Sequence, residues 1–297
     1  MLINSTALAA LRVGFSKVYD DAFAEVASQR DKVSETIPST TGENVYGWLG
    51  ELPGMREWIG ARVVHGLANH DYRIKNKDFE LTIAVPRNDI QDDNLDSYGS
   101  RFKFMGRSAA RHPEELVWNT LKAGFTTACY DGQNFFDTDH PVLDDNGEMT
   151  TVANTDGGAG APWFLMCTQE AVKPIIFQER QASTFVSRDK PDDDNVFYNK
   201  EYVYGTEARH AAGYGFWQMA WGSKQTLSAA TYGTARAGLM GMKADHGRAL
   251  GLMPNLLVVG PSLESAARKL LNSENAAGGE TNEWKGTAEL LVIPWLA

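Results

Sequence analysis

Residues 92–124, DDNLDSYGSRFKFMGRSAARHPEELVWNTLKAG, decide the fold of this chain. Apolar residues recur along the first half of the stretch at spacings of three and four: Leu95, Tyr98, Phe102, Met105 and Ala109. This spacing places an apolar stripe along one face of a helix. Residues 92–94 supply a cap and negative charge at its N-terminal end, and Gly124 suits its C-cap. At about 1.5 Å per residue the stretch spans roughly 45–50 Å, so we expect an elongated subunit.

Pro113 interrupts this pattern. Its ring disfavours the helical conformation at His112, and it has no backbone N–H, so we expect the helix to kink or restart there. Two acids, Glu114 and Glu115, then lie in the first turn of the second half. Three apolar residues continue the stripe: Leu116, Val117 and Leu121.

The composition indicates a folded protein that neither spans a membrane nor reads DNA. Of the 297 residues, 43% are hydrophobic and 22% are charged, and eight tryptophans and thirteen phenylalanines argue against disorder. No apolar run approaches a membrane span, and the N-terminus does not resemble a signal peptide. The net charge of −10 disfavours sequence-independent binding to nucleic acid, which needs a positive surface. Cys129 and Cys167 are expected to be reduced thiols of a protein made in the cytosol.

The segments before the long helix predict a helix, an extended connection and a β-hairpin. Residues 5–34 carry a loose amphipathic pattern, and residues 35–45 are polar with Pro and Gly. Alternating residues on both sides of a polar turn at 76–78 predict the hairpin, with Lys75 and Lys77 at its tip. Because its outward residues are mostly charged or polar, this hairpin is expected to rest on another part of the structure, either of this chain or of another chain.

After the long helix, the loop-rich residues 129–162 precede further strands and helices. Residues 163–187, interrupted at Pro174, and residues 196–222 are typical of sheet. The C-terminal part predicts a small α/β or α+β unit. Its elements are a helix over 228–244 capped by Ser228, a buried strand over 255–260, a helix over 263–271 capped by Ser262, and a strand over 287–295.

Asp137, Asp139 and His140 form the best candidate site, because carboxylates and an imidazole can bind a divalent metal or perform acid–base catalysis. We favour the alternative of a solvated, turn-rich loop. The acids at 192–194 lack the EF-hand pattern and are also expected to be a solvated loop. The sequence contains no dinucleotide fingerprint, P-loop, G-x-S-x-G, H-E-x-x-H or C-x-x-C motif, and nothing lowers the pKa of Cys129. We therefore predict no catalytic, cofactor-binding or metal-binding residue.

Four stretches resemble the major head subunit of Mu-like phages, the T gene product family. They are REWIGARVVHGLANHDYRIKNKDFELTIAVPRNDIQDD (56–93), HPEELVWNTLKAGFTTACYDGQNFFDTDHPV (112–142), GYGFWQMAWGSKQTLSAA (213–230) and PNLLVVGPSLESAARKLL (254–271). The likeness covers nearly the whole chain in the same order, and the motifs are long and unusual. It implies the α+β Hong Kong 97-type capsid fold of tailed phages.

The resemblance also implies a division of the chain into four parts. Residues 1–50 would be an N-terminal arm, 51–90 an extended hairpin called the E-loop, 91–225 a P-domain with a spine helix at about 92–124, and 226–297 an A-domain. In related shells the P-domain sheet often follows the A-domain, whereas here it precedes it. We therefore expect a rearranged connectivity in which the chain ends inside the A-domain.

The function implied by the resemblance is structural. The chain would self-assemble, as hexamers and pentamers, into an icosahedral shell enclosing double-stranded DNA, without sequence-specific DNA binding, enzymatic activity, a cofactor or a membrane. The expected partners are the chain itself, a scaffold or protease, a portal and decoration proteins. The expected place is the virion, after synthesis in the host cytoplasm. Some relatives form lysine–asparagine cross-links, which we do not predict for Lys75 and Lys77. The alternatives are an encapsulin-like nanocompartment shell, or a metal-dependent enzyme using Asp137, Asp139 and His140.

Overall fold

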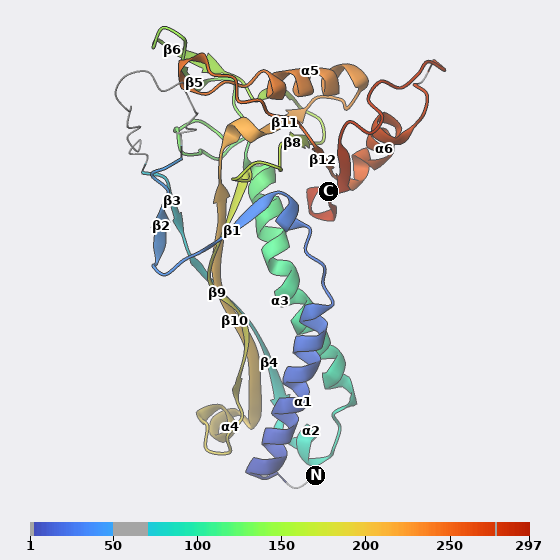
Figure 1. Cartoon of the computed structure of the whole chain (residues 1–297). Coiled ribbons are helices and arrows are strands. Elements are labelled where there is room, and N and C mark those ends of the chain that lie inside the picture. The colour runs from blue at the N-terminus through green and yellow to red at the C-terminus, as the bar shows by residue number, and fades with distance from the viewer. Residues whose placement is uncertain (1–2, 50–70, 277) are drawn as a thin grey trace.

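Figure 1 shows an elongated shaft of helices and strands that carries a broader part at one end. The computed structural model describes residues 3–49, 71–276 and 278–297. In these ranges the shaft contains a four-stranded sheet in the order β1-β9-β10-β4, and the broader part contains a five-stranded sheet in the order β13-β12-β8-β11-β7. The elongated form agrees with the length predicted for the long helix.

In the part of the chain that the structure describes, the shaft consists of four helices beside the four-stranded sheet. The helices are α1 (Ser5–Ala24), α2 (Arg87–Gln91), α3 (Asp96–Ala123) and α4 (Asp194–Asn199). The strands are β1 (Ser34–Pro38), β4 (Lys77–Pro86), β9 (Ile175–Arg188) and β10 (Glu201–Tyr214). The strand β10 lies antiparallel between β9 and β4, and β1 pairs with β9 in parallel. Since α4 connects β9 to β10, it forms the far tip of the shaft (Figure 1).

The helix α3 continues through Pro113, so the expected restart is wrong. The predicted stripe is buried on the N-terminal side of the proline: Tyr98, Phe102, Met105 and Ala109. Residues 92–94 do not cap the helix. The N-cap is Leu95, without a side-chain hydrogen bond, because the short helix α2 and a turn occupy the preceding residues. Gly124 is the C-cap, as predicted.

Two hydrophobic cores meet along α3. The shaft core surrounds the first half of the helix and includes Phe102, which is stacked on Phe15 of α1 at a centroid distance of 4.2 Å. The larger core of the broader part takes in Val117, Trp118 and Leu121 of the second half, all fully buried. The same helix therefore joins both cores, with Pro113 between them. No helix in the described ranges is long and apolar enough to cross a membrane.

The helix α1 packs along α3 and runs in the same direction (Figure 1). Asn4 caps it, since its side chain accepts a hydrogen bond from the backbone N–H of Ala7 at 2.8 Å. The two helices approach closely at Gly106, where an added Cβ would lie 2.3 Å from the carbonyl oxygen of Tyr19. The helix ends at Ala24, ten residues before the predicted end at 34, because the chain then turns into β1.

The predicted hairpin around residues 76–78 is wrong. The strand β3 (Arg73–Lys75) pairs with β2 (Glu43–Val45), whereas β4 pairs with β10. Asn76 connects β3 to β4 and is buried, with its side chain hydrogen-bonded to Gln178 at 2.7 Å and to Ser39 at 2.9 Å. Alternation therefore predicted both strands correctly but not their partners. Residues 50–70 of the expected E-loop lie outside the described residues.

The five-stranded sheet takes strands from both sides of residue 225. Its strands are β7 (Thr155–Gly158), β8 (Trp163–Met166), β11 (Ala220–Lys224), β12 (Leu256–Val259) and β13 (Glu289–Val292), and the two-stranded β5 (His140–Leu143) and β6 (Met149–Val152) lie nearby. The helices are α5 (Ala229–Met240) and α6 (Glu264–Asn272). Ser228 caps α5, as predicted, and it also forms a capping box with Thr231. The N-cap of α6 is Leu263 rather than Ser262, because a short 3-10 turn precedes the helix.

Candidate functional site

The structure does not bring Asp137, Asp139 and His140 together as a ligand set. The carboxylate of Asp137 stays within its own turn, where it accepts hydrogen bonds from Asn134 Nδ2 at 3.0 Å and from the backbone N–H of Thr138 at 2.7 Å. Asp139 is exposed, whereas His140 is fully buried. The metal-dependent alternative therefore loses its predicted ligands. The expectation of a wholly solvated loop is also wrong, since His140 lies inside the protein.

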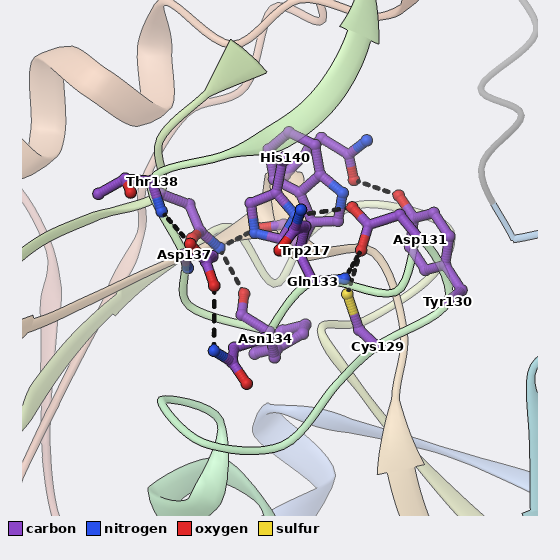
Figure 2. A network of polar contacts seen from close by, with 12 residues as sticks. Cys129, Tyr130, Asp131, Gln133, Asn134, Asp137, Thr138, His140 and Trp217 are labelled. Carbon is purple, nitrogen blue, oxygen red and sulfur yellow. Dashed lines mark hydrogen bonds and ion pairs between the residues drawn. The ribbon is translucent and has the colours of Figure 1, made fainter.

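His140 belongs instead to a cluster with Asp131, Cys129 and Trp217, which we call the His140 cluster (Figure 2). Nδ1 of His140 lies 2.7 Å from Oδ2 of Asp131, and the Cys129 thiol donates to Oδ1 of Asp131 at 3.1 Å. The imidazole stacks on the indole of Trp217, with ring centroids 3.9 Å apart and planes 7° apart. Nε2 of His140 is buried and has no hydrogen-bond partner among the described residues.

Three separate segments supply the cluster. Cys129 and Asp131 lie in a tight turn after α3, which is completed by Gly132 at a φ of 88°. Oδ1 of Asp131 also accepts the backbone N–H of Gln133 at 3.0 Å, so the carboxylate holds this turn closed. His140 begins β5, and Trp217 begins the 3-10 turn before β11. The cluster thus ties the turn after the long helix to β5 and to the 3-10 turn that precedes β11.

Electrostatics in the His140 cluster favour hydrogen bonding over metal binding. Burial alone would raise the pKa of Asp131, but hydrogen bonds from His140 and Cys129 outweigh burial and lower that pKa. Burial and the nearby negative charge of Asp131 raise the pKa of the Cys129 thiol well above its usual range. The three ligand atoms lie within 4.8 Å of one another, close enough for an ion. A metal would nevertheless have to displace the thiol proton, which this shift opposes.

A pair of histidines, separate from the His140 cluster, joins α3 to the shaft sheet. Nδ1 of His112, next to Pro113, lies 3.0 Å from Nε2 of His210 on β10. The ring of Phe79 on β4 packs against both, with centroid distances of 4.2 and 4.9 Å. Burial lowers the pKa of His112, and burial together with His112 and Arg30 lowers the pKa of His210 to about 4. No local pattern indicates this pair, because its members are 98 residues apart in the chain and lie on different elements.

Large apolar side chains are exposed along the shaft. Phe197 and Tyr198 on α4 are 77% and 76% exposed, Phe104 on α3 is 70% exposed, and Val13 on α1 is 65% exposed. Contiguous exposed apolar surface marks sites where a protein meets another molecule, and Phe197 and Tyr198 are neighbours in the chain whose rings contact each other. The surface of the shaft, rather than a cavity, is therefore the candidate functional site of this chain.

This arrangement defines a class of protein, the Hong Kong 97-type capsid proteins of tailed phages. The subunit of the bacteriophage JBD30 procapsid superimposes with a TM-score of 0.87, at 44% identity, over 99% of this chain and 100% of that chain. The JBD30 capsid decorated with minor capsid protein trimers gives a TM-score of 0.78, at 35% identity, over 100% of both chains. The expected fold class is thus confirmed.

Sequence comparison identifies the family within that class. The model of the Mu-like prophage major head subunit gpT matches residues 8–296. The chain is 41% identical, over 305 residues and 100% of both chains, to the major capsid protein of Escherichia phage Mu. The chain belongs to the Mu-like prophage major head subunit gpT family, and it is a major head protein of a tailed phage. The alternatives of a nanocompartment shell and a metal-dependent enzyme are not favoured.

Proposed function

We propose that this head subunit assembles as hexamers and pentamers into a closed icosahedral shell around packaged double-stranded DNA, without cross-links and without catalysis of its own. The observation that carries the proposal is the exposed apolar surface of the shaft, typified by Phe104 and Phe197. Contact between copies would remove this surface from water, and many modest contacts add up across a shell. The net charge of −10 would also limit adhesion of the DNA to the shell wall.

We further propose that the shaft is the P-domain and the broader part is the A-domain. The sheet order supports an A-domain made of residues 125–172 and 216–297, because β7, β8 and β11 share a sheet with β12 and β13. The chain would then pass through the P-domain in two separate stretches, and it would end in the A-domain. Of the proposed arm at 1–50, α1 packs on its own shaft. Within the proposed E-loop at 51–90, β3 pairs with β2 and β4 pairs with β10.

Accessory proteins are proposed by analogy. The JBD30 capsid carries minor capsid protein trimers, which supports a decoration protein for this shell as well. A scaffold or protease and a portal are expected of a head that packages DNA. The assembled chain would be part of the virion, and it would be made in the host cytoplasm before assembly.

Negative-stain electron microscopy of the purified chain tests the proposal. We expect closed particles from the full chain. A variant with residues 50–70 replaced by a short Gly-Ser linker should stay folded, because β3 and β4 keep their partners, but should fail to close shells. A full chain that stays monomeric at high concentration contradicts the shell. Normal particles from the deletion contradict only the E-loop assignment.

A further inference from the structure

The turn between β5 and β6 contains the only Asn-Gly pair in the sequence, Asn146 and Gly147. Both residues are exposed, and the turn lies on the side of the broader part that faces away from the shaft (Figure 1). Gly147 has a φ of 81°, and an added Cβ would meet nothing within 4 Å in the part of the chain that the structure describes. An asparagine loses its side-chain amide most readily before a glycine, because glycine leaves the attacking backbone nitrogen unhindered.

Deamidation at this pair is a reaction of the chain with itself, followed by hydrolysis. The backbone nitrogen of Gly147 attacks Cγ of Asn146, its proton leaves with the amide nitrogen as ammonia, and a succinimide ring forms. Water then opens the ring at either of its carbonyl carbons, which gives aspartate or isoaspartate. The two steps together exchange ammonia for water. Either product adds one negative charge to the turn, and isoaspartate also adds a methylene group to the backbone.

Asp144 holds this turn in a conformation that opposes the attack. Its carbonyl oxygen accepts the backbone N–H of Gly147 at 3.0 Å, so the attacking nitrogen keeps its proton and directs it across the turn. Oδ1 of its carboxylate accepts the backbone N–H groups of Asn146 and Glu148, at 2.8 and 2.9 Å. Oδ2 lies 3.4 Å from Nδ2 of Asn146, so the side-chain amide is turned toward Asp144. The attack therefore has to break several of these contacts.

We propose that Asn146 is the residue of this chain most prone to deamidation, and that Asp144 keeps it intact in the folded subunit. The hydrogen bonds from the backbone N–H groups of Glu148 and Asn146 hold the pKa of the Asp144 carboxyl below its ordinary value. The carboxylate therefore stays ionised at neutral and alkaline pH, where deamidation proceeds. The inference does not depend on shell assembly, because all of these contacts lie within one subunit.

Incubation of the free subunit in mildly alkaline buffer, with and without guanidinium chloride, measures the protection. Peptide mass spectrometry follows the conversion of each asparagine. In denaturant, Asn146 should deamidate at least about tenfold faster than Asn272, since the residue after Asn272 is a serine, whose Cβ hinders the attack. In native buffer, Asn146 should react at least about tenfold more slowly than in denaturant, because opening the turn costs several hydrogen bonds. Equal rates at Asn146 in the two conditions overturn the proposal.

Variants at Asp144 separate its hydrogen bonds from its charge. Asp144→Ala removes the side-chain acceptor and should speed the deamidation of native Asn146 at least about fivefold. Asp144→Asn keeps an oxygen acceptor without the charge and should stay within about twofold of the parent. Asp145→Ala is the matched control, because Asp145 has the same charge in the same turn but accepts none of the hydrogen bonds described for it. This control should deamidate at the parent rate.

Hydrogen exchange at the amide of Gly147 measures the opening of the turn directly, and it remains informative if a variant lowers the melting temperature. In Asp144→Ala this amide should exchange at least about fivefold faster than in the parent. Parent rates in both measurements would show that the Asp144 carboxylate does not protect Asn146. Equal acceleration by Asp144→Ala and Asp145→Ala would assign the effect to charge alone, and both results overturn the proposal. Failure of the parent chain to form particles contradicts the proposed function instead and leaves these measurements unaffected.

Discussion

The carboxylate of Glu114 holds the backbone amide of Arg30, whose nitrogen lies 2.9 and 3.1 Å from its two oxygens. The same carboxylate accepts the backbone N–H of Gln29 at 3.0 Å, the hydroxyl of Ser28 at 2.9 Å and the indole N–H of Trp118 at 3.0 Å. Glu114 is only 3% exposed. One buried acid, immediately after Pro113, therefore attaches the turn that follows α1 to the middle of the long helix.

Replacing Glu114 should weaken the fold markedly. Glu114→Ala leaves several hydrogen-bond donors without an acceptor. A hydrogen bond to a charged group contributes about 1.5–3 kcal/mol to stability. We therefore expect the free energy of unfolding to fall by about 3 kcal/mol. Urea unfolding of the free subunit measures it. The neighbouring Glu115 is exposed, and Glu115→Ala should change stability by no more than about 0.5 kcal/mol. Equal midpoints for the two variants would remove the structural role given to Glu114.

Two glycines of α3 should respond in opposite ways to alanine. At Gly106 a Cβ would lie 2.3 Å from the carbonyl oxygen of Tyr19, so Gly106→Ala must push α1 away and should cost about 1–3 kcal/mol. At Gly99 an added Cβ meets nothing within 4 Å, so Gly99→Ala should stabilise the helix by up to about 1 kcal/mol. Thermal unfolding of both variants checks this. A Gly106→Ala subunit as stable as the parent would mean that α1 is not closely packed on α3.

Acid should destabilise the shaft through His210. Its pKa is about 4 in the folded protein, against about 6.5 when unfolded. Between these values the unfolded chain binds more protons, so the free energy of unfolding falls as pH drops from 6.5 to 4. At about 1.4 kcal/mol per pKa unit, the loss approaches 3 kcal/mol at pH 4.

His210→Gln removes this titration, so its stability should depend less steeply on pH within that window. His246→Gln, at an exposed histidine, should keep the slope of the parent. Urea midpoints measured at half-unit pH steps decide the matter. Identical slopes for parent and His210→Gln would show that the pair with His112 does not resist protonation.

Chelation should leave the His140 cluster intact. Because the Cys129 thiol is protonated and donates to Asp131, we expect neither EDTA nor added zinc to shift the melting temperature by more than a degree or so. Asp131→Asn, by contrast, removes the charge that His140 and Cys129 share and should lower it by several degrees. A drop in melting temperature with EDTA that zinc reverses would make the cluster a metal site.

The two thiols should resist alkylation in the native protein. Cys129 and Cys167 are 6% and 1% exposed, and burial, with a nearby Glu170, raises the pKa of Cys167 to about 12. Little thiolate exists at pH 8, and little of it reaches solvent. Labelling with iodoacetamide followed by mass spectrometry should find both sites unmodified until urea is added. Rapid labelling of Cys129 without denaturant would show that the turn after α3 opens.

Local patterns predicted elements well and long-range partners poorly. The stripe from Tyr98 to Ala109 and the capping box at Ser228 depend on residues a few positions apart, and both are present in the structure. The strands around Asn76 alternate as any half-buried strand does. That period of two cannot say whether β4 pairs with β3 or with β10, and the shorter loop misled the prediction.

The polar sites show the same difference between local patterns, which the sequence predicts, and long-range partners, which it does not. His140 looked like a partner of Asp137 and Asp139 because all three are close in sequence, yet backbone turns use Asp137 while His140 reaches back to Asp131. The pairing of His112 with His210 depends on how α3 lies across the sheet. Such contacts follow from tertiary packing, which the resemblance to a family could indicate in outline but individual residues could not.

The placement of Pro113 has a mechanical consequence. Because α3 is packed into two separate hydrophobic cores, it transmits force from one core to the other. Its stiffness comes from its backbone hydrogen bonds. Pro113 has no N–H to donate to the carbonyl of Ala109, so one backbone hydrogen bond is absent between the two cores. Under pressure from inside a filled head, α3 should bend first at Pro113. The hydrogen bonds of Glu114 to the turn after α1 would limit this bending.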